Sequence, residues 1–352
     1  MRARPPCKYG EVTSPSDDAF SRAPDAAARD TARGELRLDP LTGEWVNIVG
    51  HRQARPNLPS EGCPFCVGGL EAPEPYDVGW FANRWPALAP GAPVDFAEIE
   101  GAIGGEYGPA GSVAVPAVGA SEVVLFSPEH GQSLAGLPRA QVRKVIDLWA
   151  ERTRSLLARD EIEYVLVFEN RGREVGATID HPHGQIYGYP FVPPAPAREM
   201  RRGNNECAVC HEVASELRAG ARIVAQCGDW LAWVPFASGY AYGMRFAPRE
   251  HVGSLPALDD RSRDDLAQLL TDALGRLDRL WPSTEGAERF PYLLWFHQAP
   301  ASGGDGWHVH AHVAPPFRAP GVPRYVASGE LGSGTLSNTV VPEDAARALR
   351  DA

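Results

Sequence analysis

The sequence predicts an α+β fold in which one unit is duplicated in tandem and antiparallel sheets pack against helices. Two observations indicate the duplication. Each half contains a Cys-x-x-Cys pair, an amphipathic helical pattern, a short strand pattern and a His-x-His segment, in that order. Turn residues separate short apolar strand patterns in both halves. We therefore divide the chain into a tail over 1–34, a first unit over 35–195 and a second unit over 196–345.

Composition narrows the class of protein. Hydrophobic residues make up 43% of the 352 residues, which is enough for a sizeable core. The formal net charge of −11 argues against binding of duplex nucleic acid, because such proteins carry a basic face. The chain has no 18-residue apolar run, so no membrane-spanning helix is expected. The tail lacks the apolar core of a signal peptide and is rich in Ala, Pro, Asp, Ser and Arg, so we expect it to be disordered on a cytoplasmic protein.

The first unit begins with a strand, a turn and a second strand over 36–46, because Asp39-Pro40 and Gly43 are turn residues. Strands are also predicted at 123–126 and 164–168. Between them, apolar residues recur at the spacing of one helix face. These residues are Val142, Val145, Ile146, Trp149 and Leu156.

The second unit repeats these elements. A serine and two leucines follow His130 and His251 at the same offsets of three, four and seven residues. A helix is predicted from the leucines that line one face between 266 and 277, and a strand at 292–296 corresponds to the one at 164–168. A glycine-rich loop over 302–306 then leads into a second His-x-His segment.

The segment His181-Pro182-His183 is the main candidate for chemistry. Proline fixes its own φ and pushes the preceding residue towards extended geometry. Residues two apart in a strand face the same side, so His181, His183 and Gln185 are expected to point into one site. Imidazole can act as a metal ligand, a base or a nucleophile, and a glutamine amide can hydrogen-bond a phosphoryl oxygen.

Two matched sets of metal-ligand residues follow from the duplication. Each set joins a Cys-x-x-Cys pair to one intermediate histidine and to the first histidine of a His-x-His segment. Two thiolates and two imidazoles satisfy tetrahedral zinc and leave no open position, so we expect two structural zinc ions per chain. The sets are Cys63, Cys66, His130 and His181, and Cys207, Cys210, His251 and His308.

The string His-Pro-His-Gly-Gln over 181–185 resembles the histidine-triad superfamily and, within it, the galactose-1-phosphate uridylyltransferase family. The resemblance covers about Glu35 to Leu331. It implies that His183 attacks the α-phosphorus of UDP-glucose and carries UMP covalently, while Gln185 hydrogen-bonds the phosphoryl group. The implied reaction is ping-pong transfer of UMP to galactose 1-phosphate, giving UDP-galactose and glucose 1-phosphate. The implied assembly is a homodimer in which both chains build each site.

The same resemblance implies the substrate contacts. Residues expected near the nucleotide or its phosphates are Arg37 and Asn83. Residues expected at the diphosphate and the hexose phosphate are Asn170, Gly176 and Thr178. A hexose contact is expected from Glu330.

Members of the family also bind a second metal through a glutamate and three histidines. These correspond here to Glu199, His297, His310 and His312. That arrangement has no use for His308, and relatives of the plant ADP-glucose phosphorylase type carry the two-cysteine, two-histidine set twice. We therefore favour Cys207, Cys210, His251 and His308 for the second zinc and keep the glutamate set as the alternative.

Two other functions stay open at this point. A related nucleotidyltransferase or phosphorylase could use ADP-sugars or another sugar 1-phosphate; Gly184 favours the uridylyl enzymes, whereas Gly329 lacks the aromatic ring that the family has beside Glu330. The chain could also be a non-catalytic nucleotide-binding zinc protein, against which the intact His-Pro-His-Gly-Gln string argues.

Overall fold

The computed structural model describes residues 34–54, 62–96, 113–202, 206–281 and 289–352. The expected disordered tail over 1–34 therefore lies outside the described residues, apart from Gly34. The two predicted units lie within one compact unit, Arg33–Ala352. No described helix is both long and apolar enough to cross a membrane.

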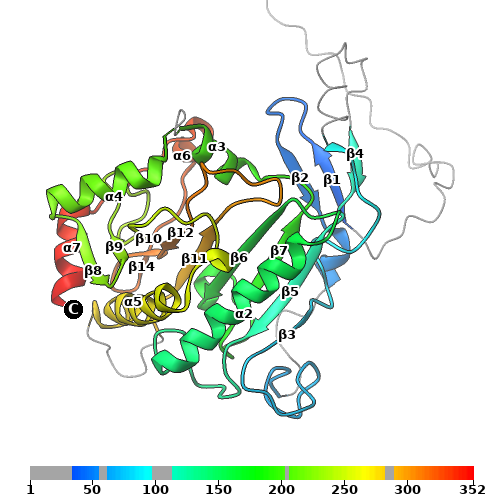
Figure 1. The fold of residues 1–352 in the computed structure, drawn as a ribbon, viewed down its shortest axis with the longest axis horizontal. Coiled ribbons are helices and arrows are strands. Elements are labelled where there is room, and N and C mark those ends of the chain that lie inside the picture. The colour runs from blue at the N-terminus through cyan, green and yellow to red at the C-terminus, as the bar shows by residue number, and fades with distance from the viewer. Residues whose placement is uncertain (1–33, 55–61, 97–112, 203–205, 282–288) are drawn as a thin grey trace, which may run out of the picture. The chain divides into compact units, whose positions relative to one another are not determined.

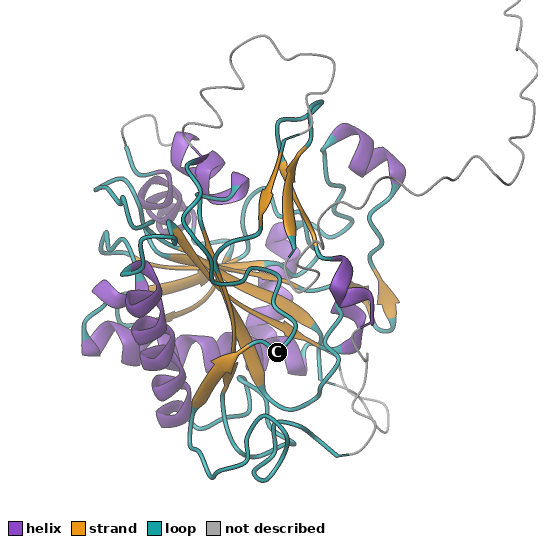
Figure 2. Cartoon of the chain, turned by 90° about the vertical axis from the view of Figure 1, so that its right-hand side faces the viewer, coloured by secondary structure: helices purple, strands orange, loops and turns teal. Residues whose placement is uncertain are grey.

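The strands of the described residues form one nine-stranded sheet and two small sheets. The large sheet has the order β3-β5-β7-β6-β11-β12-β10-β9-β8, and neighbouring strands in it are antiparallel. Figure 2 shows its strands fanning out with the twist usual for such sheets. The strands are β3 Gly79–Ala82, β5 Ala120–Leu125, β6 Tyr164–Arg171, β7 His183–Tyr189, β8 Ile223–Cys227, β9 Trp230–Trp233, β10 Met244–Pro248, β11 Tyr292–His297 and β12 His310–Ala314.

The small sheets flank this one. The order β2-β1-β4 makes a three-stranded sheet, and β13 pairs with β14. The first hairpin matches the prediction over 36–46: its turn closes with the amide of Gly43 donating to the carbonyl of Asp39 at 2.8 Å, and Gly43 has φ of 71°. The strands are β1 Glu35–Leu38, β2 Trp45–Ile48, β4 Ala114–Pro116, β13 Phe317–Ala319 and β14 Val322–Pro323.

The two longest helices cover one face of the large sheet. Figure 1 shows α2 and α5 side by side in front of the strands. Their apolar faces, which the leucine and valine spacing predicted, are fully buried in the main hydrophobic core. The helices are α2 Arg139–Leu157, α3 Pro194–Arg202, α4 Ala208–Ala219, α5 Asp260–Arg279, α6 Ser328–Ser333 and α7 Pro342–Asp351, with 3-10 turns η2 Gly50–Ala54, η3 Arg173–Val175 and η4 Leu255–Ala257.

The two predicted units meet at the pair β6 and β11. These strands are the equivalent strands of the two halves, and they pair antiparallel with Phe168 opposite Trp295. On either side lie β7 and β12, which begin at His183 and His310, the second histidines of the two His-x-His segments. The α+β fold with antiparallel sheets is therefore confirmed, and the two halves share one sheet. The predicted end of the second unit, residue 345, lies inside α7, whose Ala345, Ala346 and Leu349 are buried in the main core.

A buried ion pair attaches α2 to the sheet. Two guanidinium nitrogens of Arg152 on α2 donate to the two carboxylate oxygens of Glu122 on β5, at 2.8 and 2.9 Å. Both side chains are less than a tenth exposed, and Trp80 covers the guanidinium at 3.5 Å from its ring centroid. The bidentate geometry offsets the cost of removing two charges from water.

Breaking this pair leaves one buried charge without a partner. We expect Glu122→Ala to lower the free energy of unfolding by about 3 to 5 kcal/mol, measured by urea denaturation. The exposed pair between Lys144 and Asp77 is the control, and Lys144→Gln is expected to cost no more than about 1 kcal/mol. Equal costs for the two variants would contradict the assigned role of the buried pair.

Candidate active site and metal centres

The sheet face opposite α2 and α5 carries the candidate nucleophile. Along β7, alternate residues are buried, and His183 and Gln185 belong to the half-buried series. Gly184 between them has no room for a side chain: a Cβ there would lie 2.8 Å from the ring of Phe126 and 2.9 Å from the carbonyl oxygen of Phe168. Glycine at 184 therefore lets β7 pack closely on its neighbours while His183 and Gln185 face the other way.

A backbone hydrogen bond sets the tautomer of His183. Its Nδ1 lies 2.7 Å from the carbonyl oxygen of His181, which can only accept. The hydrogen of the neutral ring must therefore sit on Nδ1, and the lone pair lies on Nε2. In the second half, Nδ1 of His310 lies 2.8 Å from the carbonyl oxygen of His308 in the same arrangement.

His183 lines a cavity of about 450 Å³. The loop after β6 forms part of its wall, with Gly172 and Gly176 at φ of 98° and 84° on either side of η3. The described residues that line the cavity include Asn170, three arginines and three carboxylates. The charged residues are Arg171, Arg173, Arg289, Glu169, Glu174 and Asp180.

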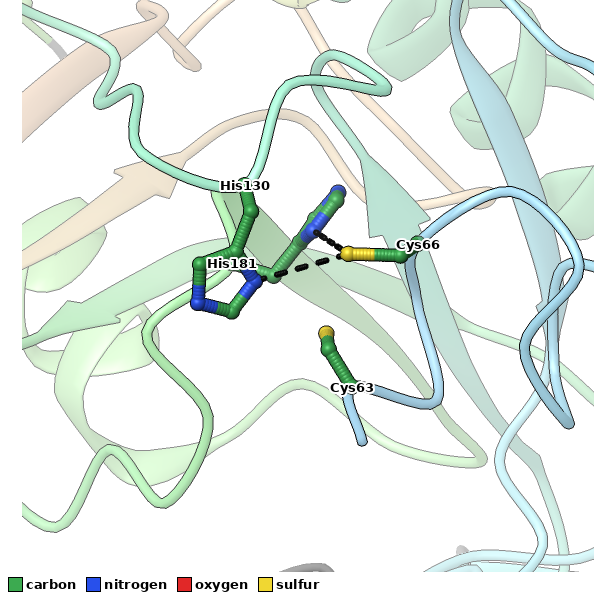
Figure 3. Close-up of side chains that lie close together, drawn as sticks. All are labelled: Cys63, Cys66, His130 and His181. Carbon is green, nitrogen blue, oxygen red and sulfur yellow. Dashed lines mark hydrogen bonds between the residues drawn. The ribbon is translucent and has the colours of Figure 1, made fainter. Parts of the chain in front are cut away.

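The first predicted metal set is assembled beside this cavity. Sγ of Cys66 lies 3.6 Å from Nδ1 of His130 and 3.7 Å from Nδ1 of His181, and Cys63 faces the same point (Figure 3). The ligand atoms all lie within 4.8 Å of one another. Burial, followed by the influence of Cys63, raises the pKa of Cys66, since two nearby thiolates repel each other without a cation. The donor set fits a tetrahedral metal ion.

The second set repeats this geometry. Cys210 lies 3.4 Å from Nδ1 of His251 and 3.3 Å from Nδ1 of His308, and Cys207 lies 3.5 Å from the latter nitrogen. Burial, followed by Cys207, raises the pKa of Cys210 to about 11. One local difference is that Cys207 caps the N-terminus of α4, where its sulfur accepts from the amide of Cys210.

Backbone carbonyls orient the inner histidine of each set. Nε2 of His181 lies 2.8 Å from the carbonyl oxygen of Ser127, and Nε2 of His308 lies 3.0 Å from that of Pro248. Each contact places the hydrogen on Nε2 and turns Nδ1 towards the cysteines. The hydroxyl of Tyr76 adds a contact to Nε2 of His181 at 2.7 Å. Such outer contacts fix the ring orientation that a metal ion requires.

The glutamate set is assembled as well. One carboxylate oxygen of Glu199 on α3 lies 2.6 Å from Nδ1 of His297 and 3.2 Å from Nε2 of His310, and the other lies 3.6 Å from Nε2 of His312. The carboxylate is held ionised, because its hydrogen bonds to His297 and then to His310 lower its pKa in spite of burial. Nε2 of His312 is buried and has no hydrogen-bond partner in the described residues.

The second cysteine set and the glutamate set therefore do not exclude each other. They share no residue, and the structure assembles both, together with the first set, among its described residues. The reason is that His308 precedes β12, whereas His310 and His312 lie on it. His308 points towards the cysteines, whereas His310 and His312 point towards Glu199. Choosing one set over the other, as the sequence analysis did, is not required by the geometry.

The predicted substrate residues are dispersed. Asn170 lines the cavity, whereas the other predicted contacts do not. Arg37 is half-exposed and pairs with Glu35 at 2.6 Å. The side-chain oxygen of Asn83 accepts from the amide of Trp85 at 2.9 Å. Glu330 is buried, pairs with Arg324 at 2.5 Å and accepts from the amides of Ala327 and Ser337. Gly176, Thr178 and Gln185 also lie outside the cavity lining, and their substrate roles stay predictions.

Sequence reasoning assigned none of the charged residues that line the cavity, and Arg289 is the one that lies farthest from the others along the chain. Arg289 precedes β11 and reaches the carbonyl oxygen of Gly131, which follows the metal-set residue His130. The contact joins residues 158 positions apart. A single arginine before an apolar strand carries no local signal, so sequence reasoning had no means of placing it here.

Comparison with known proteins agrees with this architecture. Residues 72–193 match the family model for the N-terminal domain of galactose-1-phosphate uridyl transferase, and residues 198–351 match that for its C-terminal domain. A galactose-1-phosphate uridylyltransferase of Thermotoga maritima is 36% identical over 327 residues, which cover 90% of this chain and 98% of that protein.

Structural and more distant relatives extend the comparison. A solved uridylyltransferase structure matches with a TM-score of 0.77 and 30% identity, over 90% of this chain and 97% of that one. An ADP-glucose phosphorylase of Arabidopsis thaliana is 25% identical over 97% of this chain and 99% of its own length. From the matching family models and the Thermotoga relative, we conclude that the chain belongs to the galactose-1-phosphate uridylyltransferase family.

Proposed function

We infer that this protein transfers UMP from UDP-glucose to galactose 1-phosphate and releases UDP-galactose and glucose 1-phosphate. Family membership supports the reaction, and one structural contrast supports His183 as the group that carries UMP. His183 and His310 are equivalent in the two halves, and Nδ1 of each contacts the carbonyl oxygen of the histidine two residues earlier. His183 lines a cavity, whereas His310 is buried with its Nε2 against the carboxylate of Glu199.

The first step is displacement at the α-phosphorus of UDP-glucose. Nε2 of His183 forms a bond to phosphorus, and the bond from phosphorus to the bridging oxygen breaks. The electron pair leaves with glucose 1-phosphate, whose phosphate gains one negative charge. The imidazole takes a positive charge, which the His181 carbonyl stabilises through Nδ1–H. Galactose 1-phosphate then attacks the same phosphorus in the reverse sense and releases His183.

Gln185 follows His183 on the same side of β7. Its amide can donate to a phosphoryl oxygen but cannot deliver a proton to a leaving group. This favours a phosphate acceptor over water as the partner of the second step.

The three ligand sets would hold metal ions. Zinc suits the two sets of two cysteines and two histidines, where four protein ligands leave no position for substrate and the ion would brace the fold. His181 belongs to the first of these sets, so its carbonyl, which orients His183, would be anchored there. The set of one carboxylate and three imidazoles suits zinc or iron.

A homodimer fits the placement of the remaining predicted contacts. Arg37 and Glu330 lie outside the cavity lining of their own chain. Near Glu330, the side chains of Tyr325, Val326 and Leu331 are exposed close together in the sequence, and a group of exposed apolar side chains is typical of an interaction surface. We therefore expect these segments to contribute to the site of a second copy.

The covalent step can be tested by labelling. Incubation with UDP-[α-³²P]glucose alone should attach about one UMP per chain, stable to denaturation. His183→Asn should abolish the label and lower transfer by about 10⁴-fold or more, because no nucleophile replaces the imidazole. His211→Asn, which changes an exposed histidine, is the control and should label fully. Persistent label on His183→Asn, or labelling by the ADP-glucose counterpart in place of UDP-glucose, would contradict the proposal.

The acceptor preference can be tested at Gln185. Gln185→His introduces a group that can protonate a leaving group or orient water, worth at most about 10² to 10⁴ in rate. We expect transfer to galactose 1-phosphate to fall and free UMP to rise relative to it. The ratio of the two products is the measurement, with Gln226→His at an exposed position as the control. A ratio equal to that of the parent would rule out Gln185 as the cause of acceptor preference.

The metal content can be counted. We expect about three metal ions per chain by elemental analysis, since three disjoint four-ligand sets are assembled. Glu199→Ala should remove about one ion and leave the zinc of the cysteine sets, whereas Glu44→Ala, at an exposed position, should remove none. Two ions in the parent would show that one of the three sets binds no metal, and an unchanged count in Glu199→Ala would show that it is the glutamate set.

A further inference from the structure

Three arginines line the cavity beside His183, and only two of them form ion pairs with carboxylates of the described residues. Arg173 pairs with Asp180 at 3.5 Å, and both side chains are 63% exposed, so this pair is weak. Arg171 is buried and pairs with Asp278. Arg289 forms no ion pair with a carboxylate among the described residues, and its hydrogen bond goes to the carbonyl oxygen of Gly131.

None of the carboxylates that line the cavity forms an ion pair with Arg289. Glu169 is buried and accepts a hydrogen bond from the Tyr292 hydroxyl at 2.9 Å. Burial raises the pKa of Glu169 to about 7, so it is partly neutral near pH 7. Asp180 is committed to Arg173. Glu174 is thus the carboxylate of the lining that no arginine of the described residues engages.

Arg171 and Arg289 are close enough to oppose each other's charge. After burial, the nearby Arg171 is the main cause that lowers the pKa of Arg289. Nε and Nη1 of Arg171 are buried without a hydrogen-bond acceptor among the described residues, although its guanidinium lies 5.0 Å from the ring centroid of Tyr292. Two close guanidinium groups with unused donors make a site that an anion would stabilise.

The proposed reaction supplies such an anion at this place. The leaving phosphate departs from the side of the α-phosphorus opposite Nε2 of His183, and it gains one negative charge as the bond breaks. A cation that contacts this phosphate therefore binds the leaving group more strongly than the substrate, which lowers the barrier.

We propose that Arg289, supported by Arg171, binds the phosphate of the hexose 1-phosphate in this cavity, both as it leaves in the first step and as it enters in the second. The proposal rests on the proposed function for the identity of the ligand. The arginine comes from the second unit and the nucleophile from the first, so the phosphate subsite spans the two halves of the chain.

Calorimetric titration of α-D-glucose 1-phosphate into the protein tests this without nucleotide present. Arg289→Gln should weaken binding by about 10- to 100-fold, as expected for a lost hydrogen bond to a charged group. Arg289→Lys keeps the charge and should recover part of the affinity. Arg218→Gln, which removes the same charge from an exposed position on α4, should bind as the parent does. Glucose without phosphate should not distinguish the four proteins.

Steady-state kinetics give the second readout. Arg289→Gln should raise the KM for galactose 1-phosphate by a similar factor, yet still accept about one UMP per chain from saturating UDP-glucose. If the parent protein were not labelled by UDP-glucose, the proposed function would be refuted. The calorimetric titration would still test the phosphate subsite by itself. Equal affinity for glucose 1-phosphate in the parent, Arg289→Gln and Arg218→Gln, including no binding to any of them, would overturn the role of Arg289.

Discussion

The site depends on the hydrogen bond between Nδ1 of His183 and the carbonyl oxygen of His181. This contact decides which ring nitrogen carries the lone pair, and so whether His183 can act as a nucleophile. The carbonyl is well placed because the His181 ring is held on both sides. Its Nδ1 faces the cysteines, and its Nε2 contacts the Ser127 carbonyl. The ligand set beside the cavity therefore shapes the chemistry through the backbone, without a ligand position open to substrate.

The second half of the chain contains the same arrangement, but the surroundings of its second histidine differ. His308 and His310 reproduce the contacts of His181 and His183, but Glu199 on α3 reaches Nε2 of His310. The nitrogen that would attack a phosphate in the first half instead faces a carboxylate and two further histidines in the second. One copy has a cavity beside its second histidine, and the other has the donors of a possible metal site. The difference arises from α3, from His312 in the place equivalent to Gln185, and from His297 in the place equivalent to Glu169.

Pairing of β6 with β11 joins the two halves in one sheet. It also places residues of the second unit beside the cavity of His183. Arg289 lies just before β11, so this pairing carries it to the cavity of His183. Gly172 permits the close approach, since a Cβ there would lie 2.6 Å from the ring of Pro291. The buried pair of Arg152 and Glu122 holds α2 against the opposite face. Strands β6 and β7 hold Asn170 and His183, whereas segments next to the strands supply most of the cavity lining, including Arg289.

The sequence by itself determined the duplicated α+β organisation, the cysteine and histidine sets and the direction of His183. These follow from local patterns in the sequence, namely strand alternation, helical spacing and the chemistry of metal-donor residues. Because each pattern occurs at matching positions in both halves, each prediction is supported twice. Only the tertiary structure decided that the glutamate set and the second cysteine set coexist, that Glu330 is engaged with Arg324, and that Arg289 reaches the cavity. Each of these depends on contacts between side chains from separate helices and strands. Strand order and helix packing decide such contacts. A single residue in the sequence carries no periodic pattern from which the contact could be predicted.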